Sequence, residues 1–160
     1  MLDQFNSLTE EEFEKLKDAV PLITVLIAGA DGNIHNDQLE WANKVTKIRS
    51  YNMKAEMKAF YLEVGKTFSE RLQYYIDAFP TNVADRTKLI SDRLSHLNDI
   101  LAKLEPEVGA KFYKSFTSFA EHVAKASGGF LGFFSINKDE AKLIGLPMIH
   151  PIISTSDEEE

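Results

Sequence analysis

The chain has 160 residues, the usual size of one domain, and 44% of them are hydrophobic against 27% charged, as in ordinary globular proteins. Its formal net charge is −7, but residues 157–160 contribute four acids, so the rest carries only −3 and nucleic acid is not an expected partner. The absence of cysteine excludes disulfides and thiolate metal sites.

The N-terminal segments predict helices. Thr9 and Glu12 have the spacing of a capping box, and an apolar stripe follows them. Pro21 lacks an N–H group and is expected to begin a second helix, whose residues 22–27 are apolar on all sides and therefore buried. After a turn, residues 39–48 repeat apolar side chains at helical spacing.

The remaining segments continue this pattern. A long helix is expected over residues 53–79, and a second over 83–104, with Thr81 as its cap. Pro106 is expected to begin another helix, and a short one is expected over 138–146. The chain is therefore predicted to be all-α, with about seven helices and no strand.

The chain contains no sign of secretion or membrane insertion. Its first residues do not form a basic segment leading into an apolar run, so no signal peptide is expected. The longest apolar run, at about residues 20–30, is roughly half the length of a membrane span. A cytoplasmic protein is expected.

Two stretches, residues 28–38 and 124–140, resemble each other. Each follows an apolar helix with Ala-x-Ala and a glycine turn, then places an isoleucine shortly before a polar helix start. The isoleucines are Ile34 and Ile136. This similarity predicts an internal pseudo-two-fold repeat of a helix–turn–helix unit.

The acids in these stretches have two open interpretations, helix capping and metal binding. Asp31-Gly32-Asn33-Ile34 resembles the centre of a calcium loop, but Ile27, Gly29 and Gln38 stand where an EF-hand needs oxygen ligands. An EF-hand is therefore excluded. Asp37 with Glu40, and Asn137 with Glu140, have the spacing of capping boxes.

The first stretch resembles the tellurite-resistance TerB-like family, because an apolar helix is followed by Ala-x-Ala-Asp-Gly-x-Ile and then by an acidic helix start. The second stretch resembles the same family through Gly128-Gly129-Phe130-Leu131-Gly132, which precedes Ile136. The resemblance covers residues 10–150 in layout, although its motifs are short. It implies an all-helical bundle of about seven helices with pseudo-two-fold symmetry. It also implies a non-catalytic interaction or scaffold protein in a stress-response or tellurite-resistance-type system, with acids at the turns as metal ligands.

This chain keeps one of two family acids in each half. The Asp before Gly is Asp31 in the first stretch but Ser127 in the second, and the Glu four residues after Ile is Gln38 in the first but Glu140 in the second. Asp31 and Glu140, joined by Asp37, are the expected ligands of a divalent cation, calcium or magnesium, because these ions prefer carboxylate oxygens.

No catalytic constellation is found in the sequence. The four histidines are scattered, no serine has a nucleophile-elbow context, and no phosphate-binding glycine loop follows a strand. We therefore expect a protein that is not an enzyme and has an unidentified protein partner. The alternatives are an enzyme without a recognisable site, and a peripheral membrane module using Phe130, Leu131, Phe133 and Phe134, which are expected instead to close the bundle.

We expect one domain over residues 1–153 and a disordered acidic tail over 154–160.

Overall fold

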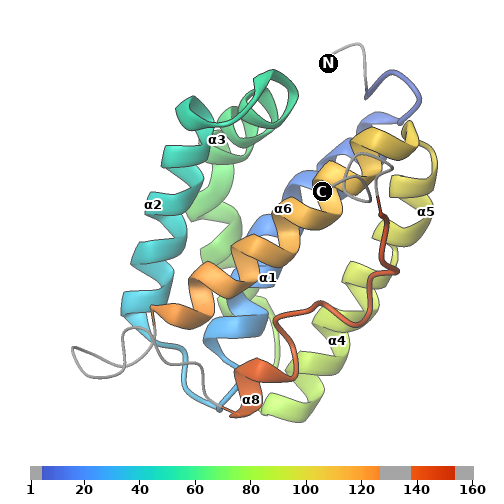
Figure 1. Cartoon of the computed structure of the whole chain (residues 1–160). Helices are drawn as coiled ribbons and strands as arrows, with labels where there is room; N and C mark the ends of the chain where they lie inside the picture. Colours follow the sequence, from blue (N-terminus) through green and yellow to red (C-terminus); the bar gives the residue numbers. More distant parts are fainter. Residues whose placement is uncertain (1–4, 127–137, 154–160) are drawn as a thin grey trace.

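The computed structural model describes residues 5–126 and 138–153, and these ranges contain helices and no strand, which confirms the all-α prediction (Figure 1). The Phe-rich segment 130–134 and the acidic tail 154–160 lie outside the described residues. The helices are α1 (Glu10–Ala28), α2 (Asn36–Asn52), α3 (Ala55–Ala78), α4 (Val83–Ser95), α5 (Leu97–Ala102), α6 (Pro106–Lys125) and α8 (Lys138–Ala141).

Helix α1 is the central element of the fold. Every residue from 19 to 28 is buried, because α1 contacts α2, α3, α4, α5 and α6. Figure 1 shows α1 beside α6, with α2 and α3 on one side of this pair and α4 and α5 on the other. The apolar run at residues 22–27 is therefore the centre of the core, as the sequence predicts.

The capping box at the start of α1 is confirmed. The Glu12 N–H donates to Thr9 Oγ1 at 3.1 Å, and the Thr9 N–H donates to Glu12 Oε1 at 2.9 Å. Two amides that have no partner within the helix are thereby satisfied.

Replacing Thr9 by alanine is expected to lower the free energy of unfolding by about 1 kcal/mol, because it removes one half of this reciprocal cap. Thr9→Ser keeps the hydroxyl and is the matched control. Urea denaturation of the three proteins measures the difference. Equal midpoints for the alanine and serine variants would contradict the role of the hydroxyl.

Pro21 does not begin a new helix, which corrects the prediction. It lies inside α1 and is buried, although a proline here removes one main-chain hydrogen bond of the helix. The prediction was wrong because burial on all sides of the following turns holds the two segments in one continuous helix. Thr24 adds a local hydrogen bond across this region, from its hydroxyl to the Val20 carbonyl at 2.9 Å.

Helix α1 ends at Gly29 beneath a buried arginine. Arg86 Nη2 of α4 donates to the Gly29 carbonyl at 2.7 Å, which places a positive charge at the negative end of the helix dipole. A Cβ at Gly29 would lie 2.5 Å from that nitrogen. Only glycine leaves room for this contact.

The single helix expected over residues 83–104 is also wrong. The structure divides it at His96 into α4 and α5. Asn82, not Thr81, caps α4, because its side chain accepts from the Asp85 N–H at 3.0 Å. The leucine spacing alone did not show this break, since apolar side chains on both sides of it are buried.

Helix α6 brings an aromatic cluster to the core. Pro106 is its first residue, as predicted, and Phe112, Phe116 and Phe119 are fully buried. The Phe112 ring meets the Phe60 ring of α3 edge to face, with centroids 4.8 Å apart. The hydrophobic core extends from Phe5 to Ile149, so the described residues share one core.

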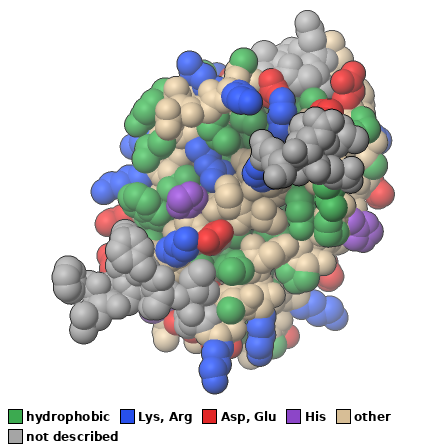
Figure 2. Space-filling model, viewed as in Figure 1, with side chains coloured by type: hydrophobic (Ala, Val, Ile, Leu, Met, Phe, Trp, Pro, Cys, Tyr) green, Lys and Arg blue, Asp and Glu red, His purple; other side chains and the backbone are tan. Residues whose placement is uncertain are grey.

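No described helix combines the length and the apolar character that crossing a membrane requires. On the face in Figure 2, hydrophobic side chains lie among charged ones over the α2 and α3 side of the molecule.

Candidate functional site

Asp31 stabilises its own turn. Its Oδ1 accepts from the Asn33 N–H at 3.0 Å, and its Oδ2 lies 2.9 Å from His35 Nε2. Burial opposes ionisation of this carboxyl, but the hydrogen bonds from His35 and Asn33 outweigh burial and lower its pKa below the ordinary value. Asp31 is therefore ionised at neutral pH and holds the chain between α1 and α2.

Asp37 lies in the first turn of α2 and is exposed. The capping box expected for Asp37 with Glu40 is wrong, because His35 is the N-cap residue and makes no side-chain cap hydrogen bond. The structure instead places the negative charge of Asp37 at the positive end of the helix dipole.

Glu140 is fully buried at the start of the C-terminal segment and contacts α2. Its Oε2 is 2.5 Å from Nε2 of Gln38, a residue 102 positions earlier, and both side chains have 0% exposure. Gln38 Nε2 also donates to the Val123 carbonyl at 3.1 Å. The two positions that each follow an isoleucine by four residues thus meet directly.

The amide of Gln38 is only half satisfied. Its Oε1 is buried and has no hydrogen-bond partner among the residues that the structure describes. An unpaired buried carbonyl costs about 1–3 kcal/mol. This acceptor and the Glu140 carboxylate provide the oxygen-rich chemistry that hard cations prefer.

The three predicted metal ligands have separate surroundings. Asp31 binds His35, Glu140 binds Gln38, and Asp37 is exposed. Within residues 5–126 and 138–153, no group of three or more His, Asp or Glu side chains is placed to hold a metal ion. The metal site stays a prediction.

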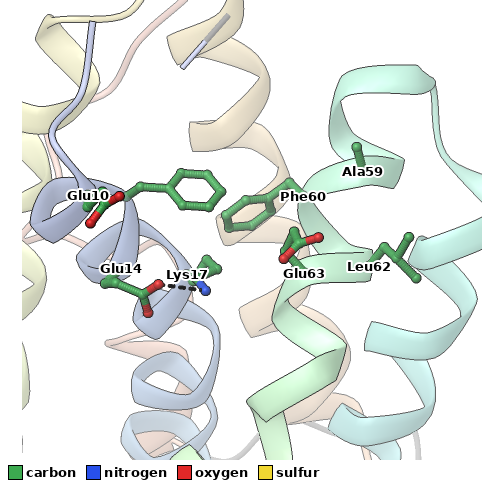
Figure 3. A pocket seen from close by; sticks show the side chains of 8 residues that line it. Glu10, Glu14, Lys17, Ala59, Phe60, Leu62 and Glu63 are labelled. Atoms are coloured by element: carbon green, nitrogen blue, oxygen red, sulfur yellow. Dashed lines mark ion pairs between the residues drawn. The ribbon is translucent and has the colours of Figure 1, made fainter. Parts of the chain in front are cut away.

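A groove of about 750 Å³ lies between α1 and α3 (Figure 3). Its aromatic floor is the partly exposed ring of Phe13, which meets the fully buried Phe60 ring edge to face, with centroids 6.4 Å apart. Leu62 on its rim is 53% exposed. The lining residues are Glu10, Phe13, Glu14, Lys17, Ala59, Phe60, Leu62 and Glu63.

The charge around this groove is predominantly negative. Among the described residues, three glutamates and one lysine line it. Lys17 Nζ lies 2.8 Å from the Glu14 carboxylate and Lys66 Nζ lies 2.7 Å from that of Glu63, so Glu10 is the lining glutamate that forms no ion pair with a described residue. Lys17 also lies over the Phe13 ring, 5.5 Å from its centroid. Figure 3 shows the carboxylates of both helices around the facing rings.

No sequence pattern indicates this groove. Phe60 belongs to the apolar stripe of the helix predicted over residues 53–79, and nothing in that stripe indicates an opening beside it. The proximity of Phe13 to Phe60 depends on how α1 packs on α3, and no local pattern in either helix shows it.

Comparison of the chain with models of protein families, with curated protein sequences and with solved structures finds no match.

Proposed function

We propose that this chain is a non-catalytic helical interaction protein that binds a basic amphipathic helix in the groove between α1 and α3. The observation that carries the proposal is the combination of an aromatic floor and an acidic rim in one groove. A helix that places large apolar side chains on one face and lysines or arginines beside them matches both properties.

The energetics of such a complex are those of a helix bound in a groove. Apolar side chains of the partner are buried against Phe13 and Leu62, at about 25 cal/mol per Å² removed from water. Phe60 has 0% exposure and supports the Phe13 ring from beneath. The acids on the rim orient the partner and raise its association rate, and salt screens this contribution.

The test uses a synthetic helix with leucine on one face and lysine on the flanks, and a second peptide with glutamate in place of lysine. The basic peptide is expected to bind, and the acidic one is not. Glu10→Lys is expected to weaken binding about fivefold, or ~1 kcal/mol, because it places a cation on the rim. Isothermal titration calorimetry measures both affinities.

Glu11→Lys is the matched control. It makes the same charge change in the same helical turn, but Glu11 does not line the groove. Equal losses for Glu10→Lys and Glu11→Lys would show that only the overall charge matters. Equal binding of both peptides, or of neither, would overturn the proposal.

We further propose the TerB-like family, with its pseudo-two-fold repeat and bundle of about seven helices, and a role in a stress-response or tellurite-resistance-type system. The support is the contact between Gln38 and Glu140, which occupy equivalent places in the two similar stretches. Two equivalent residues touch when they lie beside an axis that relates the two units.

We also propose that the protein binds a calcium or magnesium ion beside this contact. The unpartnered Gln38 oxygen and the Glu140 carboxylate support this proposal. After chelator treatment, a saturating cation is expected to raise the melting temperature, since a ligand at a hundredfold excess over its Kd stabilises by about 2.7 kcal/mol. Calcium, magnesium, manganese and zinc are compared on wild type and Glu140→Gln. No shift with any cation, or an equal shift in the variant, would contradict this site.

A further inference from the structure

Arg49 is a buried cation between α2 and α6. Only 7% of the residue is exposed. Its Nη1 donates to Tyr61 Oη at 2.8 Å and to the Ser115 carbonyl at 2.9 Å, and its Nη2 donates to Ser118 Oγ at 2.7 Å. The guanidinium also lies over the rings of Tyr61 and Phe119, at 5.2 and 5.5 Å from their centroids.

These partners are all neutral. Within the described residues, all hydrogen bonds of Arg49 come from Nη1 and Nη2, and none of them reaches a carboxylate. A guanidinium has five N–H donors in a rigid plane, and its Nε side pairs well with the two oxygens of a carboxylate. Burial of a charge without a counter-ion is costly. An anion beside the guanidinium would offset that cost.

A cleft of about 260 Å³ opens beside this arginine. Apolar and aromatic side chains form most of its wall, which is the usual composition of a small-molecule site with few polar groups. Its residues are separate from those of the groove between α1 and α3. They are Trp41, Val45, Ile48, Arg49, Asn52, Met53 and His122.

His122 adds a second nitrogen donor at the edge of the cleft. Burial, followed by the charges of Arg49 and Lys125, lowers the pKa of His122 below its ordinary value. Glu121, the preceding residue, opposes this lowering of the His122 pKa, but its carboxylate is paired with Lys125 at 2.8 Å. None of the described residues that line the cleft is an acid.

We propose that this cleft binds a small monocarboxylate with a compact apolar or aromatic body, its carboxylate against Arg49 and its body against Trp41, Ile48 and Met53. The apolar wall favours a single negative charge over a hydrated dianion, because only the carboxylate end has donors to replace its water. A neutral compound of the same shape leaves the guanidinium without a counter-ion.

The chain carries its own reporter for this site, because Trp41 is its only tryptophan. Three probes are titrated against the full chain: phenylacetate, its neutral analogue phenylacetamide, and inorganic phosphate. Phenylacetate is expected to change Trp41 fluorescence and to bind at least about tenfold more tightly than either other probe. In NMR titrations, saturating phenylacetate is expected to raise the pKa of His122, because a bound anion favours the imidazolium.

Two variants of one rim residue test the electrostatics without disturbing the core. Ile48 is 38% exposed. Ile48→Glu places a like charge beside the ligand and is expected to abolish phenylacetate binding. Ile48→Lys loses the same apolar contact but adds a cation, so it is expected to bind phenylacetate more weakly than wild type and clearly more tightly than Ile48→Glu. Both variants keep Arg49 and its hydrogen bonds intact.

Several results would overturn the proposal. They are no fluorescence response to phenylacetate, equal binding of phenylacetate and phenylacetamide, and binding of phosphate as tight as that of phenylacetate. Equal affinities of Ile48→Glu and Ile48→Lys would overturn it as well. An unchanged His122 pKa at saturation would place the ligand elsewhere.

Discussion

Phe60→Ala is expected to lower the free energy of unfolding by about 3–5 kcal/mol, which is a large share of the 5–15 kcal/mol typical of a domain. Phe60 has 0% exposure and lies where α1, α3 and α6 meet. Its ring contacts those of Phe13, Tyr61, Phe112 and Phe116, with centroid separations from 4.8 to 6.4 Å. Truncation removes both transfer free energy and the contacts of its neighbours.

Leu62→Ala is the matched control, because Leu62 is two residues away on the same helix and is 53% exposed. It is expected to cost well under 1 kcal/mol, as surface substitutions usually do. Urea denaturation monitored by circular dichroism measures both variants. A loss below about 1 kcal/mol for Phe60→Ala would show that the aromatic cluster is not packed as described.

The main helices could be predicted because each contains its own signal. Thr9 with Glu12 predicts the start of α1, Pro106 predicts the start of α6, and the phenylalanine spacing after Pro106 identifies the buried face. The residues of each pattern lie within one or two helical turns of each other. Because they interact with near neighbours in the chain, the sequence alone indicates the structure that they form.

The errors arise where packing outweighs local propensity. Pro21 is expected to interrupt a helix, but the surrounding core holds α1 continuous. Ile48 continues an apolar stripe and is expected to be inward, but it is 38% exposed on the rim of a cleft. In each case the outcome depends on neighbouring helices that the local pattern does not specify.

The sites depend on long-range contacts and could be predicted only in part. The similarity of residues 28–38 to 124–140 singled out both Gln38 and Glu140, yet it did not predict that they touch. No local pattern distinguishes Arg49 from the other cations, because its burial without a carboxylate partner arises only when α2 packs against α3 and α6.

Gln38→Glu is expected to destabilise the protein by about 3–5 kcal/mol at neutral pH, because it replaces the donor to Glu140 with a second carboxylate in a buried site. Gln38→Met is the matched control. It removes the same hydrogen bonds without adding charge, and it is expected to cost less, about 1–3 kcal/mol. Thermal and urea denaturation at pH 7 compare the two variants with wild type.

The pH dependence of Gln38→Glu follows from proton sharing between the two carboxyls. Carboxylates in contact do not both ionise readily, so the folded variant retains a proton to a higher pH than the unfolded chain, where a glutamate releases it at about pH 4.3. The added stability is therefore present below that pH, and it is lost as the pH rises through the pKa of the shared carboxyl proton in the folded variant. Gln38→Met has one buried carboxyl instead of two, so its stability is expected to depend less on pH than that of Gln38→Glu.

Cations provide the last test of the pair. Calcium and magnesium prefer carboxylate oxygens. Gln38→Glu has two buried carboxylates at this contact, whereas the wild-type protein has one carboxylate and one amide. Either ion is therefore expected to restore most of the stability of Gln38→Glu at pH 7, and to leave Gln38→Met unchanged. Failure of every divalent cation to rescue the variant would contradict a cation site at the contact of α2 with the C-terminal segment. Insensitivity of the variant to pH would contradict the contact between Gln38 and Glu140 itself.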